Sequence, residues 1–212
     1  MIKFFLGYIV PLFILAPLIV GLRGFRSFDQ AAKTLVWYLI ISAFTTIIAV
    51  YLAYNHINNM PVFHIFTILE FMILTLFYRH LAANRLAKQV LTFFICAFLV
   101  FGIINAIYIQ PINTYNSLPR SIESLLLITF SLTSFYTSLG ENNTTLKRTK
   151  DLLWINIGII CYFSGALFLF IFSEYIAKDP STYRIGWIIH AVLLAAVLYT
   201  MITVYFIKTK NK

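Results

Sequence analysis

PVFHIFTILEFMILTLFY, residues 61–78, is an apolar run whose one acidic side chain, Glu70, lies close to its middle. A hydrocarbon core of ~30 Å takes about 20 apolar residues in a helix, so this run predicts a membrane-spanning helix. Six further runs have a similar composition and length. Together the seven expected spans cover residues 3–21, 35–53, 61–78, 90–109, 122–139, 152–173 and 185–206.

The composition indicates an integral membrane protein. Hydrophobic residues make up 61% of the chain and charged residues 11%, about half the share found in soluble domains. Runs such as IIAVYLAY (47–54) and LLLITFSL (125–132) lack the charged face of a soluble amphipathic helix. We therefore expect an all-α fold: one seven-helix transmembrane domain over residues 1–212, without a soluble catalytic or DNA-binding module. The net charge of +9 is spread over short loops, which argues against nucleic acid as a partner.

The basic residues predict the orientation in the membrane. Twelve Lys and Arg residues fall on one side of the expected spans and four on the other, and basic loops tend to stay in the cytoplasm. We therefore expect the N-terminus outside, the C-terminus in the cytoplasm, and an inner rim suited to anionic lipids. The twelve are Arg23, Arg26, Lys33, Arg79, Arg85, Lys88, Lys147, Arg148, Lys150, Lys208, Lys210 and Lys212, and the four are Lys3, Arg120, Lys178 and Arg184.

Polar side chains inside the spans are the candidates for function, because a charged group at the centre of a bilayer costs about 2.5–3.5 kcal/mol. Glu70 follows Pro61 by nine residues, which places it ~13 Å deep. In the expected orientation this depth lies in the outer half of the membrane. We predict a polar ligand-binding pocket that opens to the outside and has Glu70 as its floor. Its candidate residues are His64, Thr67, Glu70, Asn105, Glu123 and His190.

The same residues also admit structural roles. A protonated Glu70 can bond to Thr67 or to a residue of the fifth or seventh span, and Glu123 can pair with Arg120 three residues earlier. The two cysteines have no disulfide or metal-binding pattern. Packing near a helix end is the alternative role of His64 and His190. We expect Asn156 to make contacts between helices, and Cys96 and Cys161 to be small buried packing residues.

Several activities lack the residues they need. Seven helices in this orientation resemble the rhodopsins, but the last span has no lysine for retinal before Lys208 at its cytoplasmic edge. Seven-helix zinc hydrolases share a His-x-x-x-His pair, and no two histidines here have that spacing. We therefore expect neither retinal nor zinc. A metal site would have to be assembled across three helices, from His64, Glu70, Glu123 and His190.

A short internal echo is compatible with a small transporter. Residues 33–37, KTLVW, open the second span, and residues 150–154, KDLLW, open the sixth. Both pentapeptides start at the expected cytoplasmic face, as a parallel three-plus-one-plus-three repeat requires. The echo covers five residues only.

Two segments carry a family resemblance. NNMPVFHIFTILEF (58–71), and WINIG (154–158) with YFSG (162–165), resemble small uncharacterised seven-helix membrane proteins of Bacteroidota. The resemblance implies the bacterial inner membrane and brings no assigned activity. More distantly, the layout is similar to the seven-helix sensory modules of bacterial signalling proteins, although we expect no output domain here.

Three functions are compatible with these residues. The first is a sensor or binding-type protein that couples an external small molecule or lipid to a cytoplasmic protein partner. The second is a small proton-coupled transporter that uses Glu70. The third, and least favoured, is a lipid-acting intramembrane enzyme, metal-dependent or not, that uses His64, Glu70 and His190.

Overall fold

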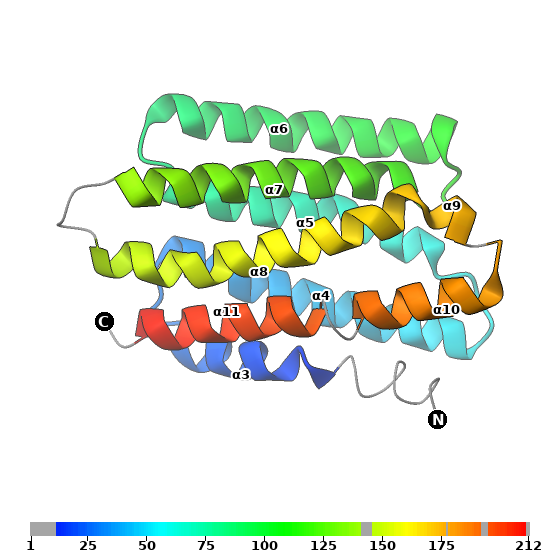
Figure 1. Cartoon of the computed structure of the whole chain (residues 1–212), viewed down its shortest axis with the longest axis horizontal. Coiled ribbons are helices and arrows are strands. Elements are labelled where there is room, and N and C mark those ends of the chain that lie inside the picture. The colour runs from blue at the N-terminus through cyan, green and yellow to red at the C-terminus, as the bar shows by residue number, and fades with distance from the viewer. Residues whose placement is uncertain (1–11, 141–145, 177, 192–194, 211–212) are drawn as a thin grey trace.

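The structure is a computed structural model that describes residues 12–140, 146–176, 178–191 and 195–210, and the regular elements of this part of the chain are all helical. The long helices lie side by side along one common direction (Figure 1). The α-helices of the described chain, short ones included, are α3 (Leu15–Gly24), α4 (Gln30–Tyr54), α5 (Met60–Leu81), α6 (Arg85–Ile104) with a π-helical end (Asn105–Ile109), α7 (Ser117–Gly140), α8 (Leu146–Ile171), α9 (Ser173–Ile176), α10 (Pro180–Ile189) and α11 (Ala195–Lys210).

The helices begin where the sequence supplies capping side chains. The Asp29 carboxylate accepts a hydrogen bond from the Ala32 amide at 2.8 Å and caps α4, and Asn84 caps α6 through the Ala87 amide at 2.7 Å. Pro61 occupies the first turn of α5, where its missing amide leaves no broken bond. The chain therefore turns in the short polar segments between the apolar runs.

Four helices of the described chain are long and apolar enough to cross a membrane: Gln30–Tyr54, Met60–Leu81, Arg85–Ile109 and Asp151–Ile171. They match the second, third, fourth and sixth expected spans. α7 is 24 residues long but carries Arg120 and Glu123 in its first two turns. The described part of the first span is the short helix α3, because residues 3–11 lie outside the described residues. The described helices of the seventh span are α10 and α11, and residues 192–194 lie outside the described residues.

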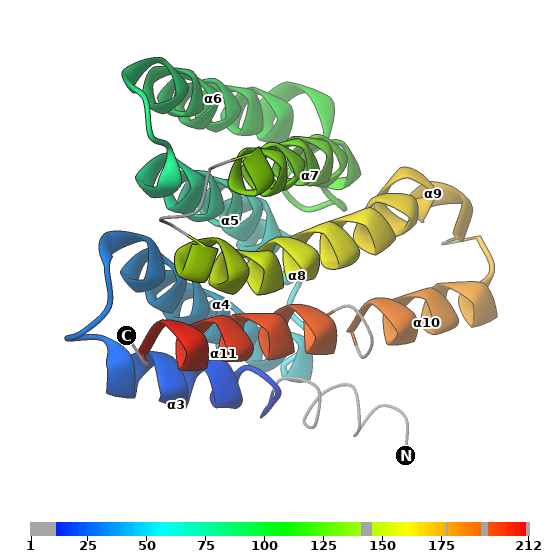
Figure 2. The ribbon, with the colours of Figure 1, turned by 60° about the vertical axis from the view of Figure 1, so that its left-hand side comes forward.

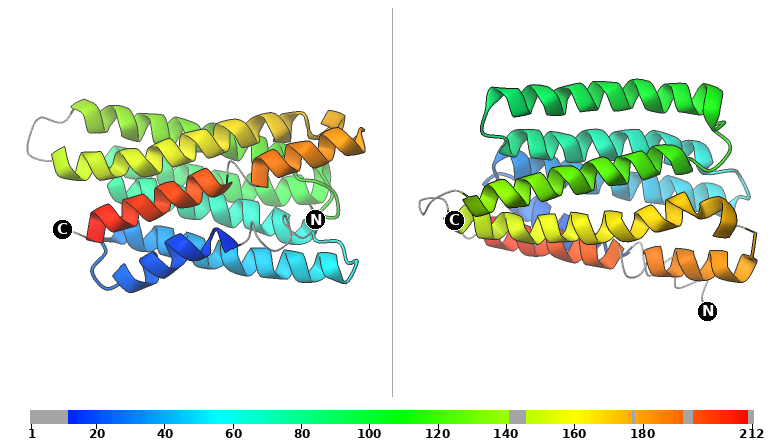
Figure 3. Two further views of the ribbon diagram at one scale, coloured as in Figure 1. Left: turned by 60° about the horizontal axis from the view of Figure 1, so that its bottom comes forward. Right: turned by 45° about the horizontal axis from the view of Figure 1, so that its top comes forward.

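Six helical positions close a ring. Neighbours pack in the order α3, α4, α5, α7, α8 and α11, and α11 returns to α3. α6 stands outside this ring and packs on α5 (Figure 2). α3 and α7 run in one direction, as do α4 with α8 and α5 with α11 (Figure 3). Each helix of the first three thus has a counterpart at the opposite position of the ring.

The two ends of the bundle differ in their loops. Loops 25–29 and 82–84 lie at the same end as the end of α11, whereas loops 55–59 and 110–116 lie at the other end (Figure 1). The helix ends beside the first set carry most of the basic residues of the described chain. Successive loops thus lie at alternate ends of the bundle, as the count of basic residues on the two sides of the expected spans assumes.

Apolar contacts fill the interior and also cover the outside of the bundle. Phe71 and Phe98 stack with ring centroids 4.1 Å apart and seat α6 on α5. Phe44 and Phe93 are 64% and 66% exposed, as side chains that face lipid would be in a protein-only structure. Cys96 and Cys161 are also exposed, so the expectation that they are buried packing residues was wrong. Both lie on outward faces of helices.

Candidate functional site

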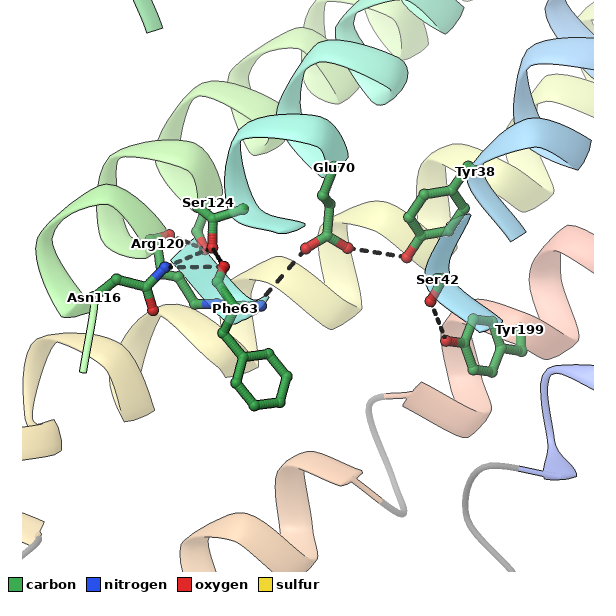
Figure 4. A network of polar contacts seen from close by, with 9 residues as sticks. Tyr38, Ser42, Phe63, Glu70, Asn116, Arg120, Ser124 and Tyr199 are labelled. Carbon is green, nitrogen blue, oxygen red and sulfur yellow. Dashed lines mark hydrogen bonds and ion pairs between the residues drawn. The ribbon is translucent and has the colours of Figure 1, made fainter. Parts of the chain in front are cut away.

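Glu70 lies in the interior of the bundle with two polar partners. Its side chain is 1% exposed. The Tyr38 hydroxyl on α4 donates to Oε1 at 3.0 Å, and Arg120 Nη1 on α7 lies 3.9 Å from Oε2 (Figure 4). The prediction that Glu70 faces inward and has a polar partner is confirmed. Arg120 belongs to α7 but precedes the expected fifth span, 122–139, so neither it nor Tyr38 was among the partners expected from the sequence.

Arg120 enters the bundle although the sequence placed it in an outer loop. α7 begins at Ser117, so Arg120 belongs to its first turn and its side chain is buried. The guanidinium carbon lies 5.1 Å from the ring centroid of Phe170 and 6.0 Å from that of Phe66. Aromatic faces attract a cation that has lost its water, so both rings help to hold the charge inside.

Glu123 is a second buried acid beside the same arginine. It is 0% exposed and lies one turn after Arg120 on α7, on the same side of the helix. Neither carboxylate oxygen accepts a hydrogen bond from any described residue. The ion pair expected between Arg120 and Glu123 is replaced by the pair with Glu70, because Glu70 faces the guanidinium from the neighbouring helix.

Thr67 and His64 hold the loop 110–116 against α5. Asn116 Nδ2 donates to the Thr67 hydroxyl at 2.7 Å and to the Phe63 carbonyl at 3.3 Å. His64 Nε2 lies 3.0 Å from the Thr114 carbonyl oxygen, so the tautomer with a proton on Nε2 donates there. Asn116, which is 1% exposed, could not be singled out from the sequence because it lies in a loop rather than in a span.

No described hydrogen bond or ion pair joins His190 or Asn105 directly to Glu70. The His190 ring is 5.5 Å from that of Tyr162 and 5.7 Å from that of Phe170, the ring that also contacts Arg120. Asn105 begins the π-helical end of α6, where its amide donates to Gln110 Oε1 at 3.5 Å. His190 thus shares the Phe170 ring with Arg120, whereas Asn105 bonds to Gln110 at the start of the 110–116 loop.

Most of the candidate residues are covered by the rest of the chain. Five of the six candidate side chains are buried and His190 is half-buried. We call Glu70, Arg120, Glu123 and Tyr38 the charged cluster. Within the described ranges, no group of three or more His, Cys, Asp or Glu side chains is placed to hold a metal ion.

A further polar contact crosses the ring beside the charged cluster. The hydroxyls of Ser42 on α4 and Tyr199 on α11 lie 3.1 Å apart (Figure 4). Polar side chains thus join α4 to both α5 and α11. The interior of the ring is therefore polar at this level.

Comparison of this chain with protein-family models, with curated proteins and with solved structures returned no match. The function of the chain is therefore inferred from the geometry of the charged cluster.

Proposed function

We propose that this chain is a seven-span protein of the bacterial inner membrane that carries a small polar solute together with protons. In this proposal the N-terminus lies outside and the C-terminus in the cytoplasm. The observation that carries the proposal is a buried cation, Arg120, that pairs with the buried acid Glu70 while a second buried acid, Glu123, lies one turn further along the same helix without a hydrogen-bond donor among the described residues.

The charge balance of the cluster favours a bound proton. With Glu70, Arg120 and Glu123 all ionised, the cluster carries a net charge of −1 in an apolar surrounding. Glu70 is compensated by Arg120 and Tyr38, but no described residue donates to Glu123. An uncompensated buried charge costs several kcal/mol, which a proton on Glu123 removes. A solute that contacts Arg120 or Glu70 would change this balance, and so couple its own binding to proton release.

The order of the helices supports transport as well. Parallel repeats of three helices, joined by one extra helix, occur in small transporters. Here α3–α4–α5 and α7–α8–α11 occupy opposite halves of the ring and α6 stands outside it. The echoing pentapeptides KTLVW and KDLLW open α4 and α8, the middle helices of the two halves.

Flux measurements in reconstituted vesicles test this proposal. A pH-sensitive dye inside the vesicles reports proton movement after addition of amino acids, monosaccharides or dicarboxylates in turn. We expect one solute class to drive proton flux in the native protein, and Glu70→Gln and Glu123→Gln to abolish it. Asp179→Asn, which alters an exposed acid, is the control that keeps the flux. Native flux that equals that of empty vesicles for every class contradicts transport.

A receptor is the second candidate, and the polar contacts between helices favour it. Tyr38, Glu70 and Arg120 connect α4, α5 and α7, and the basic ends of α4 and α5 lie at the expected cytoplasmic end. A ligand that displaced Glu70 from Arg120 would let α5 and α7 shift, and a cytoplasmic partner could read that shift. Ligand-induced thermal stabilisation of the purified protein, without any solute-driven flux, would select this candidate.

The enzyme hypothesis gains less from the geometry. It requires His64, Glu70 and His190 to converge on one substrate. His64 instead contacts the 110–116 loop through Thr114, and the His190 ring lies tilted against the rings of Tyr162 and Phe170.

A further inference from the structure

A second polar cluster lies deeper in the bundle, between α5, α7 and α8. The Tyr78 hydroxyl donates to Asn156 Oδ1 at 3.1 Å. The Ser131 hydroxyl lies 3.1 Å from the main-chain carbonyl oxygen of Asn156 and 3.2 Å from its Oδ1. The Asn156 amide in turn donates to the Ser134 hydroxyl at 3.3 Å. We call these four residues the inner cluster. They are polar and uncharged, in contrast to the charged cluster.

The two clusters succeed one another along the same helices. On α5, Tyr78 lies eight residues beyond Glu70, which is ~12 Å nearer to the basic end. On α7, Ser131 lies eleven residues beyond Arg120, ~16 Å in the same direction. α8 supplies Asn156 to the inner cluster and, further along, the rings that surround His190.

An apolar layer separates the two clusters. Leu74 on α5 lies four residues from Glu70 and four from Tyr78, and Leu127 on α7 lies between Arg120 and Ser131. Ile159 is the corresponding residue of α8, three residues beyond Asn156. Leu74, Leu127 and Ile159 are all 0% exposed and belong to one buried apolar cluster.

A buried polar atom at this level has no partner among the described residues. The Thr75 hydroxyl is buried and makes no hydrogen bond to any of them. Thr75 adjoins Leu74 and lies one turn before Tyr78 on the same side of α5. A buried hydroxyl without a partner destabilises the fold. A water or solute that passed from one cluster to the other would supply the missing hydrogen bond.

We infer that the inner cluster is a second binding station for a hydrogen-bonding solute and its water, and that Leu74, Leu127 and Ile159 form the barrier between the two stations. This inference rests on the proposed transport function. Apolar constrictions exclude water, and a proton cannot cross where the chain of hydrogen bonds is broken. The barrier would thus keep the outer, charged station from leaking protons to the inner, neutral one.

Proton leak in the absence of any solute tests the barrier directly. Vesicles that contain the reconstituted protein and a trapped pH dye are given a membrane potential with potassium and valinomycin. We expect Leu127→Ser to raise the leak at least about tenfold over the native protein. Leu132→Ser is the matched control, because Leu132 lies on α7 with 51% of its side chain exposed. Equal leak in the two variants would overturn the barrier.

A misfolded Leu127→Ser protein would leave the test open, so two further variants accompany it. Ile159→Ser breaches the same layer from α8 and should also leak, whereas Leu127→Met keeps the volume and should not. Each protein is first required to be monodisperse with native helix content. A leak in Leu127→Met equal to that in Ile159→Ser would also overturn the inference.

The inner station is tested in the leaking background. Asn156→Leu removes the side-chain amide that bonds to Tyr78, Ser131 and Ser134, so Leu127→Ser with Asn156→Leu should lose most of the leak. An undiminished leak would remove the inner cluster from the route. Solute-driven flux in the native protein without a leak in Leu127→Ser would reject the barrier alone. A leak without any solute-driven flux would reject transport and keep the barrier.

Discussion

Glu70 and Arg120 are fifty residues apart in sequence, and their charged groups lie 3.9 Å apart between α5 and α7. Both side chains are almost fully removed from solvent. In such a place each charge is tolerated only because the other is present. Loss of one partner from a buried pair costs about 3–5 kcal/mol, whereas replacement of both by neutral groups costs far less. The effect on stability of a substitution at Glu70 therefore depends on whether Arg120 is present, and the reverse.

Arg120→Met is therefore expected to lower the free energy of unfolding by about 3–5 kcal/mol, because it strands Glu70 in an apolar site. The double variant Arg120→Met with Glu70→Gln should be more stable than Arg120→Met alone. Denaturant titration in detergent micelles measures the free energy of unfolding of each protein. The native protein, Arg120→Met, Glu70→Gln and the double variant form a double-mutant cycle. Strictly additive effects would show that the two groups do not interact.

Tyr38→Phe removes the hydroxyl that donates to Glu70 and leaves the ring in place. Hydrogen bonds to charged groups contribute about 1.5–3 kcal/mol, so we expect a loss of stability in that range. Tyr51→Phe is the control, since Tyr51 lies on the same helix and is 64% exposed. Its effect should stay within about 0.5 kcal/mol. Equal losses for the two variants would argue against the bond.

Gly158 allows α8 and α11 to approach one another closely. A Cβ at this position would lie 2.7 Å from Met201 Cβ, which is too close for both to keep their places. We expect Gly158→Val to cost about 1–3 kcal/mol through overpacking. Cys161→Val changes an exposed residue of the same helix and should be neutral. Thermal unfolding in micelles compares the two, and an unaltered midpoint for Gly158→Val would contradict the close packing.

The expected orientation is open to labelling in intact cells. In a background without Cys96 and Cys161, single cysteines in the 111–118 loop and at Lys3 should react with a membrane-impermeant maleimide. Cysteines at Lys147 and Lys212 should react only after lysis. Reaction at position 212 in intact cells would reverse the orientation and would place the charged cluster in the cytoplasmic half.

Asp179 predicts a pH effect at the start of α10, outside the membrane spans. The Thr182 hydroxyl and the amides of Thr182 and Ser181 donate to its carboxylate and lower its pKa below the ordinary 3.8. Since the folded pKa is the lower one, this stabilisation is present above pH ~3.9 and is lost as the pH falls through the folded value. A carbon-13 titration of Asp179 should have its midpoint below 3.8, and Thr182→Ala should raise it.

Ser181→Ala is the control for that titration, because the donor at this position is the backbone amide, which the substitution keeps. Its midpoint should match that of the native protein. If Thr182→Ala and Ser181→Ala leave the midpoint equally unchanged, the hydroxyl of Thr182 does not act on Asp179.

The helices of this protein could be predicted from the sequence because each one satisfies its backbone within its own segment. A stretch such as residues 61–78 has no turn residue inside it, and the capping residues Asp29 and Asn84 lie outside the runs. The position of Glu70 near the middle of α5 followed from its place within the apolar run. Its burial followed from the cost of a charge in lipid.

The partners of Glu70 depended on the tertiary structure. Whether Tyr38 or another side chain faces Glu70 depends on the rotation of α4 and α5 about their axes and on their offset along the bundle. The hydropathy of the sequence predicts neither the rotation nor the offset. The sequence left Arg120 in a loop, because the polar first turn of α7 lowers the hydropathy where the helix begins. Arg120 is buried only because α7 packs against α5, which places the Glu70 carboxylate opposite its guanidinium. Without that carboxylate, the buried charge of Arg120 would lose its ion-pair partner.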